Sequence, residues 1–89
     1  MNKKKLLWRL MSSPRNIRFA DFCTLAEAFG FRLVRIRGSH HIYQHPGIPD
    51  SLNIQDAQGQ AKPYQINQFL TLIEQYRLTL DNTGADEEE

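Results

Sequence analysis

Two strand-like runs separated by only two residues constrain the fold of this chain most strongly. Residues 31–37 and 40–45 both read as β-strands, and only Gly38 and Ser39 lie between them. A two-residue connection that contains glycine is typical of the tight turn of an antiparallel hairpin. Since an antiparallel sheet can carry helices on one face and leave the other to solvent, we expect one covered and one open face.

The remaining elements follow from apolar spacing and from turn residues. Apolar side chains at helical spacing predict helices over 3–11, 19–29 and 63–78. Gly30 is a suitable left-handed C-cap for the second helix, and Pro63 suits the first position of the third. Residues 46–50 are expected to form a loop, and the alternation in 51–55 predicts a third strand. The predicted fold class is therefore α+β, in the order helix, helix, three antiparallel strands, helix.

Length and composition limit the class of protein. A chain of 89 residues forms one small domain, which leaves little room for a deep pocket. The single cysteine, Cys23, cannot form an intramolecular disulfide and reads as a small core residue in a reducing compartment. Arg9 interrupts the first apolar run, so we expect neither a signal peptide nor a membrane span. We therefore expect a cytoplasmic protein.

The small net charge of +1 conceals an asymmetry along the chain. Residues 81–89 contain five acidic residues and read as a disordered tail, so we expect one domain over 1–80. That domain holds 11 Lys and Arg against 5 Asp and Glu, a net charge of +6. Such a charge permits binding to a polyanion such as nucleic acid, although it is also an ordinary way to stay soluble.

The hairpin carries histidines, whose pKa of about 6.5 suits proton transfer near neutral pH. Successive strand residues point to opposite faces, so His41, Tyr43 and His45 share one face and Ile42 lies on the other. Because Ile42 is the strongest core candidate, we expect His41 and Tyr43 on the open face. No cysteine or carboxylate stands at ligand spacing to these histidines, so no metal site or cofactor is expected.

Three segments form a recognisable set: Gly30-Phe31-Arg32-Leu33-Val34, Arg37-Gly38-Ser39-His40-His41-Ile42-Tyr43 and Ala61-Lys62-Pro63-Tyr64-Gln65-Ile66. Together they resemble the HicA family of toxins, the mRNA-cleaving partners of HicB antitoxins. The resemblance extends from about Ile17 to Leu78, and its most specific part is the Gly-Ser-x-His core followed by an aliphatic and an aromatic residue. The chain differs from shorter family members by its additional N-terminal helix, its acidic tail and a less basic segment around 51–60.

The resemblance implies a double-stranded-RNA-binding-domain-like fold and a metal-independent endoribonuclease with one essential histidine. The family's histidine is the second residue after the serine, which is His41 here, so the neighbouring His40 inherits no role. The expected partners are RNA and a HicB-like antitoxin. A non-catalytic RNA-binding module, or an antitoxin-binding domain with the same fold, remains the alternative. We expect four further residues to contact RNA: Arg37, Ser39, Tyr43 and Lys62.

Overall fold

The computed structural model describes residues 2–80 and contains the six predicted elements in the predicted order. The α+β fold class with a three-stranded antiparallel sheet is therefore confirmed. The expected acidic tail, 81–89, lies outside the described residues. The elements are α1 (Lys3–Ser12), α2 (Phe19–Ala28), β1 (Arg32–Arg37), β2 (His40–His45), β3 (Ile48–Gln55) and α3 (Pro63–Tyr76).

The helices begin and end where local chemistry sets their limits. The Asn2 side chain accepts a hydrogen bond from the Lys5 N–H at the start of α1. After α2 the chain turns at Gly30, whose φ of +99° is the left-handed conformation expected of a C-cap. Pro63 occupies the start of α3, and Arg77 ends that helix in a left-handed conformation. The helix ends predicted at Gly30 and Pro63 are thus confirmed.

The sheet has the order β1-β2-β3, and both strand pairs are antiparallel. One boundary was predicted wrongly, because β3 begins at Ile48 and includes part of the expected 46–50 loop. Pro46 and Gly47 alone form the turn, and His45 pairs with Ile48. Pro49 is tolerated because β3 is an edge strand, where a missing N–H need not interrupt the pairing.

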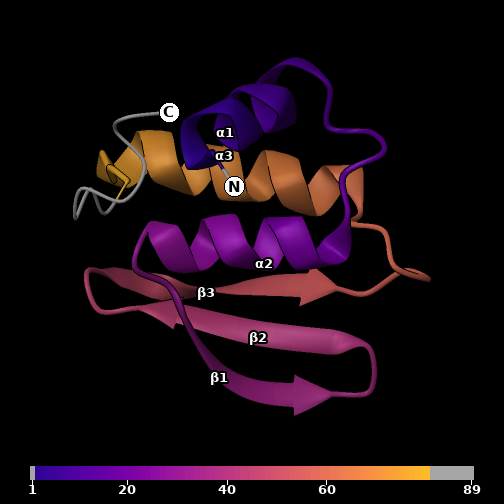
Figure 1. Cartoon of the computed structure of the whole chain (residues 1–89). Helices are drawn as coiled ribbons and strands as arrows, with labels where there is room; N and C mark the ends of the chain where they lie inside the picture. Colours follow the sequence, from indigo (N-terminus) through magenta and orange to yellow (C-terminus); the bar gives the residue numbers. More distant parts are fainter. Residues whose placement is uncertain (1, 81–89) are drawn as a thin grey trace.

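The helices cover the sheet unevenly. Figure 1 shows α2 and α3 close to β3, α1 beyond them, and β1 as the strand farthest from the helices. The apolar side of α1 points inward, and Leu6 and Leu10 are buried there. In contrast, every residue of β1 is exposed. The core contains Leu10, Ile17, Phe22, Leu25, Phe29, Phe31, Tyr43, Leu52, Ile54, Ile66 and Phe69 among others.

The two faces of β2 are the reverse of the expectation. Tyr43 is 2% exposed and pairs with the fully buried Leu52, so its face lies under the helices. Ile42 is only half-buried and lies on the open face, opposite Arg35 and Asn53. The prediction that His41 and Tyr43 occupy the open face is therefore wrong. A tyrosine ring buries a large apolar surface, and here it outweighs the isoleucine.

Candidate functional site

His41 lies on the face of the sheet that the helices cover, close to where that covering ends. On β3 its partner is Ile54, which is fully buried, whereas on β1 its partner is Ile36, which is 55% exposed. The ring meets Phe19, the first residue of α2, edge to face with the centroids 4.7 Å apart. His41 is therefore half-buried, packed beneath the start of α2 and reachable from the uncovered side of β1.

The imidazole of His41 has an uncommitted nitrogen. Its Nδ1 is buried and has no hydrogen-bond partner within residues 2–80. A buried polar atom without a partner costs roughly 1–3 kcal/mol of stability. Catalytic groups are among the residues at which such unpaired buried atoms occur.

The other two histidines are held by hydrogen bonds. Nδ1 of His45 accepts from the Gly47 N–H at 3.0 Å, so the proton is on Nε2, which donates to the Phe29 carbonyl at 3.1 Å. His45 therefore ties the end of β2 to the turn after α2. His40 lies on the open face with Nδ1 3.1 Å from Oδ1 of Asn53. Of the three histidines, His41 is the one whose ring makes no hydrogen bond within residues 2–80.

The turn before His41 is fixed by the segment that follows β3. The Ser39 carbonyl accepts from the Asp56 N–H at 2.8 Å, and the Ser39 hydroxyl accepts from Nε2 of Gln55 at 3.3 Å. The same segment also reaches α2, because the Phe19 N–H donates to the Gly59 carbonyl at 3.0 Å. Hydrogen bonds from residues 55–59 thus fix both the turn before His41 and the start of α2, against which His41 packs.

Two helix starts and three basic residues lie at this end of the sheet. Figure 1 shows α2 and α3 beginning at the same end as the β1–β2 turn. The N-cap residues are Arg18 and Lys62, and neither helix start carries a side-chain cap. Arg37 lies opposite His40 at the base of the turn. Positive helix ends and basic side chains both favour an anion, and a phosphate is the group that such an arrangement suits.

Tyr43 does not belong to this group. Its ring is in the core and its hydroxyl donates to Oε2 of Glu27 at 3.4 Å, so the expected contact of Tyr43 with RNA has no exposed ring to use. Burial raises the pKa of the Tyr43 hydroxyl above its ordinary range, and contact with Cys23 raises it further. Burial also raises the pKa of the Cys23 thiol, more than its contact with Tyr43 lowers it. These are the properties of inert packing groups, as expected for Cys23.

Two residues near the site were not predicted from the sequence. Phe19 was seen only as the first residue of a helix, and its ring contact with His41 depends on tertiary structure. Gln65 is 1% exposed, and its Oε1 accepts from the Gln55 N–H at 2.8 Å, which fixes the start of α3 to the end of β3. The signal for Gln65 in the sequence was its place as a polar residue among the apolar positions of the predicted helix 63–78.

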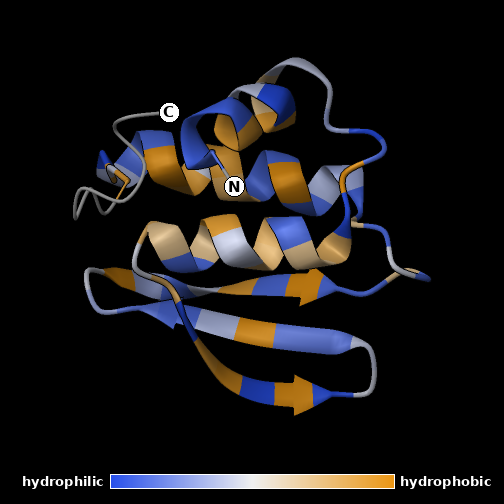
Figure 2. Ribbon diagram, viewed as in Figure 1, coloured by the Kyte–Doolittle hydropathy of each residue, from blue (hydrophilic) through white to orange (hydrophobic). Residues whose placement is uncertain are grey.

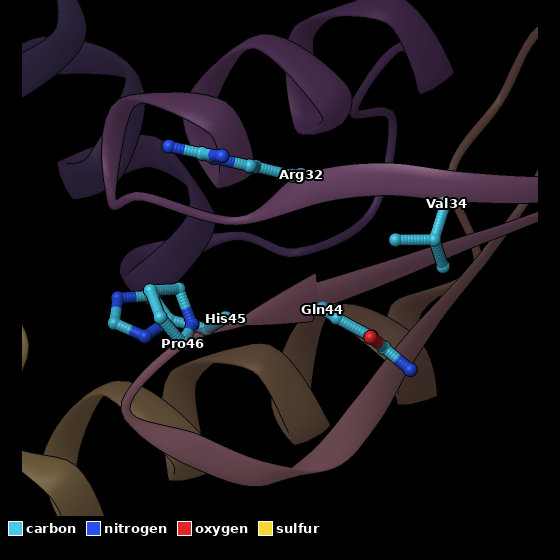
Figure 3. A pocket seen from close by; sticks show the side chains of 5 residues that line it. All are labelled: Arg32, Val34, Gln44, His45 and Pro46. Atoms are coloured by element: carbon cyan, nitrogen blue, oxygen red, sulfur yellow. The ribbon is translucent and has the colours of Figure 1, made fainter.

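A shallow hollow lies at the opposite end of the hairpin. Figure 3 shows it between the start of β1 and the end of β2, where Arg32, Val34, Gln44, His45 and Pro46 line it. His41 is not among these residues. The hollow is therefore separate from the candidate site.

Within residues 2–80 the structure has neither a candidate metal centre nor a helix that could span a membrane. No group of three or more His, Cys, Asp or Glu side chains within 2–80 is placed to hold a metal ion. No helix in that part of the chain has both the length and the apolar character needed to cross a membrane.

Comparison with known proteins identifies the family. The family described as the HicA toxin of bacterial toxin-antitoxin systems matches residues 19–75, which is more than half of the chain. A search of curated proteins and a search of solved structures each gave no match. The chain is thus an α+β domain, and it belongs to the HicA toxin family. Helix α1 precedes the matched region.

Proposed function

We propose that this protein is the toxin of a toxin-antitoxin pair and acts as a metal-independent endoribonuclease on mRNA, with His41 as its catalytic histidine. The observation that carries the proposal is the contrast among the three histidines. His40 and His45 are held by hydrogen bonds, whereas His41 is uncommitted at the end of the sheet where cations and helix starts gather. Membership of the HicA family supports the toxin assignment.

The chemistry assigned to His41 is proton transfer during cleavage of a phosphodiester. The 2′-oxygen of the RNA attacks the adjacent phosphorus and the 5′-oxygen leaves, which yields a 2′,3′-cyclic phosphate and a 5′-hydroxyl. His41 accepts the proton of the 2′-hydroxyl or supplies one to the leaving oxygen. A positioned acid or base of this kind contributes about 10² to 10⁴-fold to the rate.

Arg37 lies on the open face with His40, and it is proposed to contact the RNA backbone next to the point of cleavage. Lys62 is proposed to stabilise the charge that develops on the cleaved phosphate, together with the start of α2. The Ser39 hydroxyl is proposed as a hydrogen-bond partner for the same phosphate. Both cations stand at the His41 end of the sheet, and neither forms an ion pair within residues 2–80. We infer a cytoplasmic location, because mRNA is the substrate, and a HicB-like antitoxin as the inhibitor.

The test compares His41→Gln with His40→Gln on a defined single-stranded RNA in the presence of EDTA. Glutamine keeps a polar side chain but transfers no proton, and the two positions are neighbours on opposite faces of one strand. We expect loss of cleavage in His41→Gln and substantial activity in His40→Gln, with thermal melts establishing that both variants fold. Full cleavage by His41→Gln would overturn the catalytic assignment and favour a non-catalytic RNA-binding domain.

A further inference from the structure

Strand β1 is exposed in a way that the other strands are not. All six of its residues are exposed, and β2 is its only partner strand within residues 2–80. Three of these residues are apolar, and they are 42%, 50% and 55% exposed: Leu33, Val34 and Ile36. Figure 2 shows hydrophobic and hydrophilic positions following one another along this strand. An exposed apolar edge strand is a template for pairing with another chain.

A β-bulge aligns three arginines on the open face of β1. Arg37 and Arg35 lie opposite His40 and Ile42, and the register then shifts between Leu33 and Arg35. Because of this shift Arg32 pairs with Gln44, an exposed residue of the open face. Without the additional residue, Arg32 would face the helices.

None of these arginines is neutralised within residues 2–80, where no salt bridge or side-chain hydrogen bond involves Arg32, Arg35 or Arg37. Like charges placed directly opposite each other destabilise a strand pair. The arginine row therefore disfavours pairing of β1 with a second copy of this chain. It leaves the edge open to a strand of the opposite charge.

The other edge of the sheet carries different features. Strand β3 includes Pro49, Asp50 and Ser51, and its apolar residues Ile48, Leu52 and Ile54 are buried. Proline and polar residues are usual means of blocking an edge. The two edges are thus chemically unequal, because β3 carries proline and polar residues where β1 exposes apolar residues beside arginines.

We propose that β1 is the docking edge for an extended segment of a partner protein, in which acidic residues alternate with apolar ones. The segment adds a fourth antiparallel strand, with its acidic side chains opposite the arginines and its apolar side chains against Leu33 and Ile36. Main-chain hydrogen bonds supply affinity and the alternating side chains supply specificity. The inference rests on the membership of a toxin-antitoxin family and is independent of RNA cleavage.

RNA fits this edge less well than a protein strand. A phosphate backbone could satisfy the arginines, but it would leave Leu33 and Ile36 in water and could not pair with the free main chain of β1. A strand in which acidic and apolar residues alternate would pair with the arginines, cover Leu33 and Ile36, and bond to the free main chain of β1. The arginines and the exposed apolar residues are therefore explained by one partner.

The experiment uses a synthetic peptide about eight residues long, in which Glu and Val alternate, added to the full-length protein. Binding is measured by calorimetry and mapped by amide hydrogen exchange. Control peptides replace Glu with Lys or carry N-methyl groups on alternate residues, which remove main-chain donors. Arg35→Glu removes the complementary charge on β1, and Arg15→Glu makes the same change in the exposed connector between α1 and α2.

We expect the Glu-Val peptide to bind and to slow amide exchange along β1. Arg35→Glu should weaken binding roughly fivefold to tenfold, while Arg15→Glu should leave it nearly unchanged. The Lys-Val and N-methylated peptides should not bind. Absence of binding by the Glu-Val peptide, protection confined to β3, or protection of β1 by oligouridylate in place of the peptide would overturn the proposal.

Discussion

Replacing His41 with phenylalanine separates the contribution of this residue to function from its contribution to stability. The buried Nδ1 without a partner costs roughly 1–3 kcal/mol, and phenylalanine removes that atom. The edge-to-face contact with Phe19, worth about 0.5–1.5 kcal/mol for an aromatic pair, is kept. Since the ring is only half-buried, we take the lower part of the range and expect a gain of about 1 kcal/mol.

For a domain of this size a gain of about 1 kcal/mol raises the melting temperature by roughly 4–8 °C. The assay is thermal unfolding followed by circular dichroism, together with cleavage of a single-stranded RNA. His40→Phe is the matched control, because it exposes a phenyl ring on the open face and removes the contact with Asn53. It should lower stability by about 1 kcal/mol and leave cleavage largely intact. A fall in the melting temperature of His41→Phe as large as that of the control would refute the reasoning.

Further predictions concern stability, pH and salt. His45→Ala removes two hydrogen bonds and should destabilise the fold by about 2–3 kcal/mol, measured by urea unfolding. Gly30→Ala should cost at least about 1–2 kcal/mol in the same assay, because φ is +99° and a Cβ would lie 2.9 Å from Nε2 of His45; an unchanged midpoint would contradict this. Burial raises the pKa of the Cys23 thiol above its ordinary value of 9.0, and that of the Tyr43 hydroxyl above 10.0. The folded state therefore holds both protons more tightly than the unfolded state, and the stability that this gives is complete below about pH 9. Stability should fall as pH rises above about 9, and Tyr43→Phe should flatten that fall. RNA binding should weaken with salt at a log–log slope of about −1.4 if Arg37 and Lys62 each contact one phosphate, and a slope near zero would exclude these contacts.

The element order was predictable because local chemistry determines it. Gly30, the Gly38-Ser39 turn and Pro63 mark boundaries through their own backbone preferences, and the structure has boundaries at all three. The start of β3 was not predictable in the same way. The segment Pro46 to Asp50 has the composition of a loop, and it becomes partly strand because pairing with β2 overrides local preference.

The face of β2 shows what strand periodicity leaves undecided. Alternation separates His41 and Tyr43 from Ile42, but it does not say which set the helices cover. A further signal was present, because a two-residue turn places Arg37 opposite His40 and Arg35 opposite Ile42. Two arginines beside Ile42 indicate that its face is the open one. The contact of Phe19 with His41 had no such signal, since it joins residues distant in the sequence.

The most direct test of the central claim is the chemistry of the RNA ends. Wild-type protein and His41→Phe are incubated in EDTA with a defined mRNA fragment and with its DNA equivalent, and the products are identified by mass spectrometry. We predict that the wild type produces 2′,3′-cyclic phosphate and 5′-hydroxyl ends from RNA alone, and that folded His41→Phe produces none. The same products from His41→Phe would contradict the claim that His41 transfers a proton during attack by the 2′-hydroxyl. Cleavage of the DNA would contradict the claim that the 2′-hydroxyl is the attacking group.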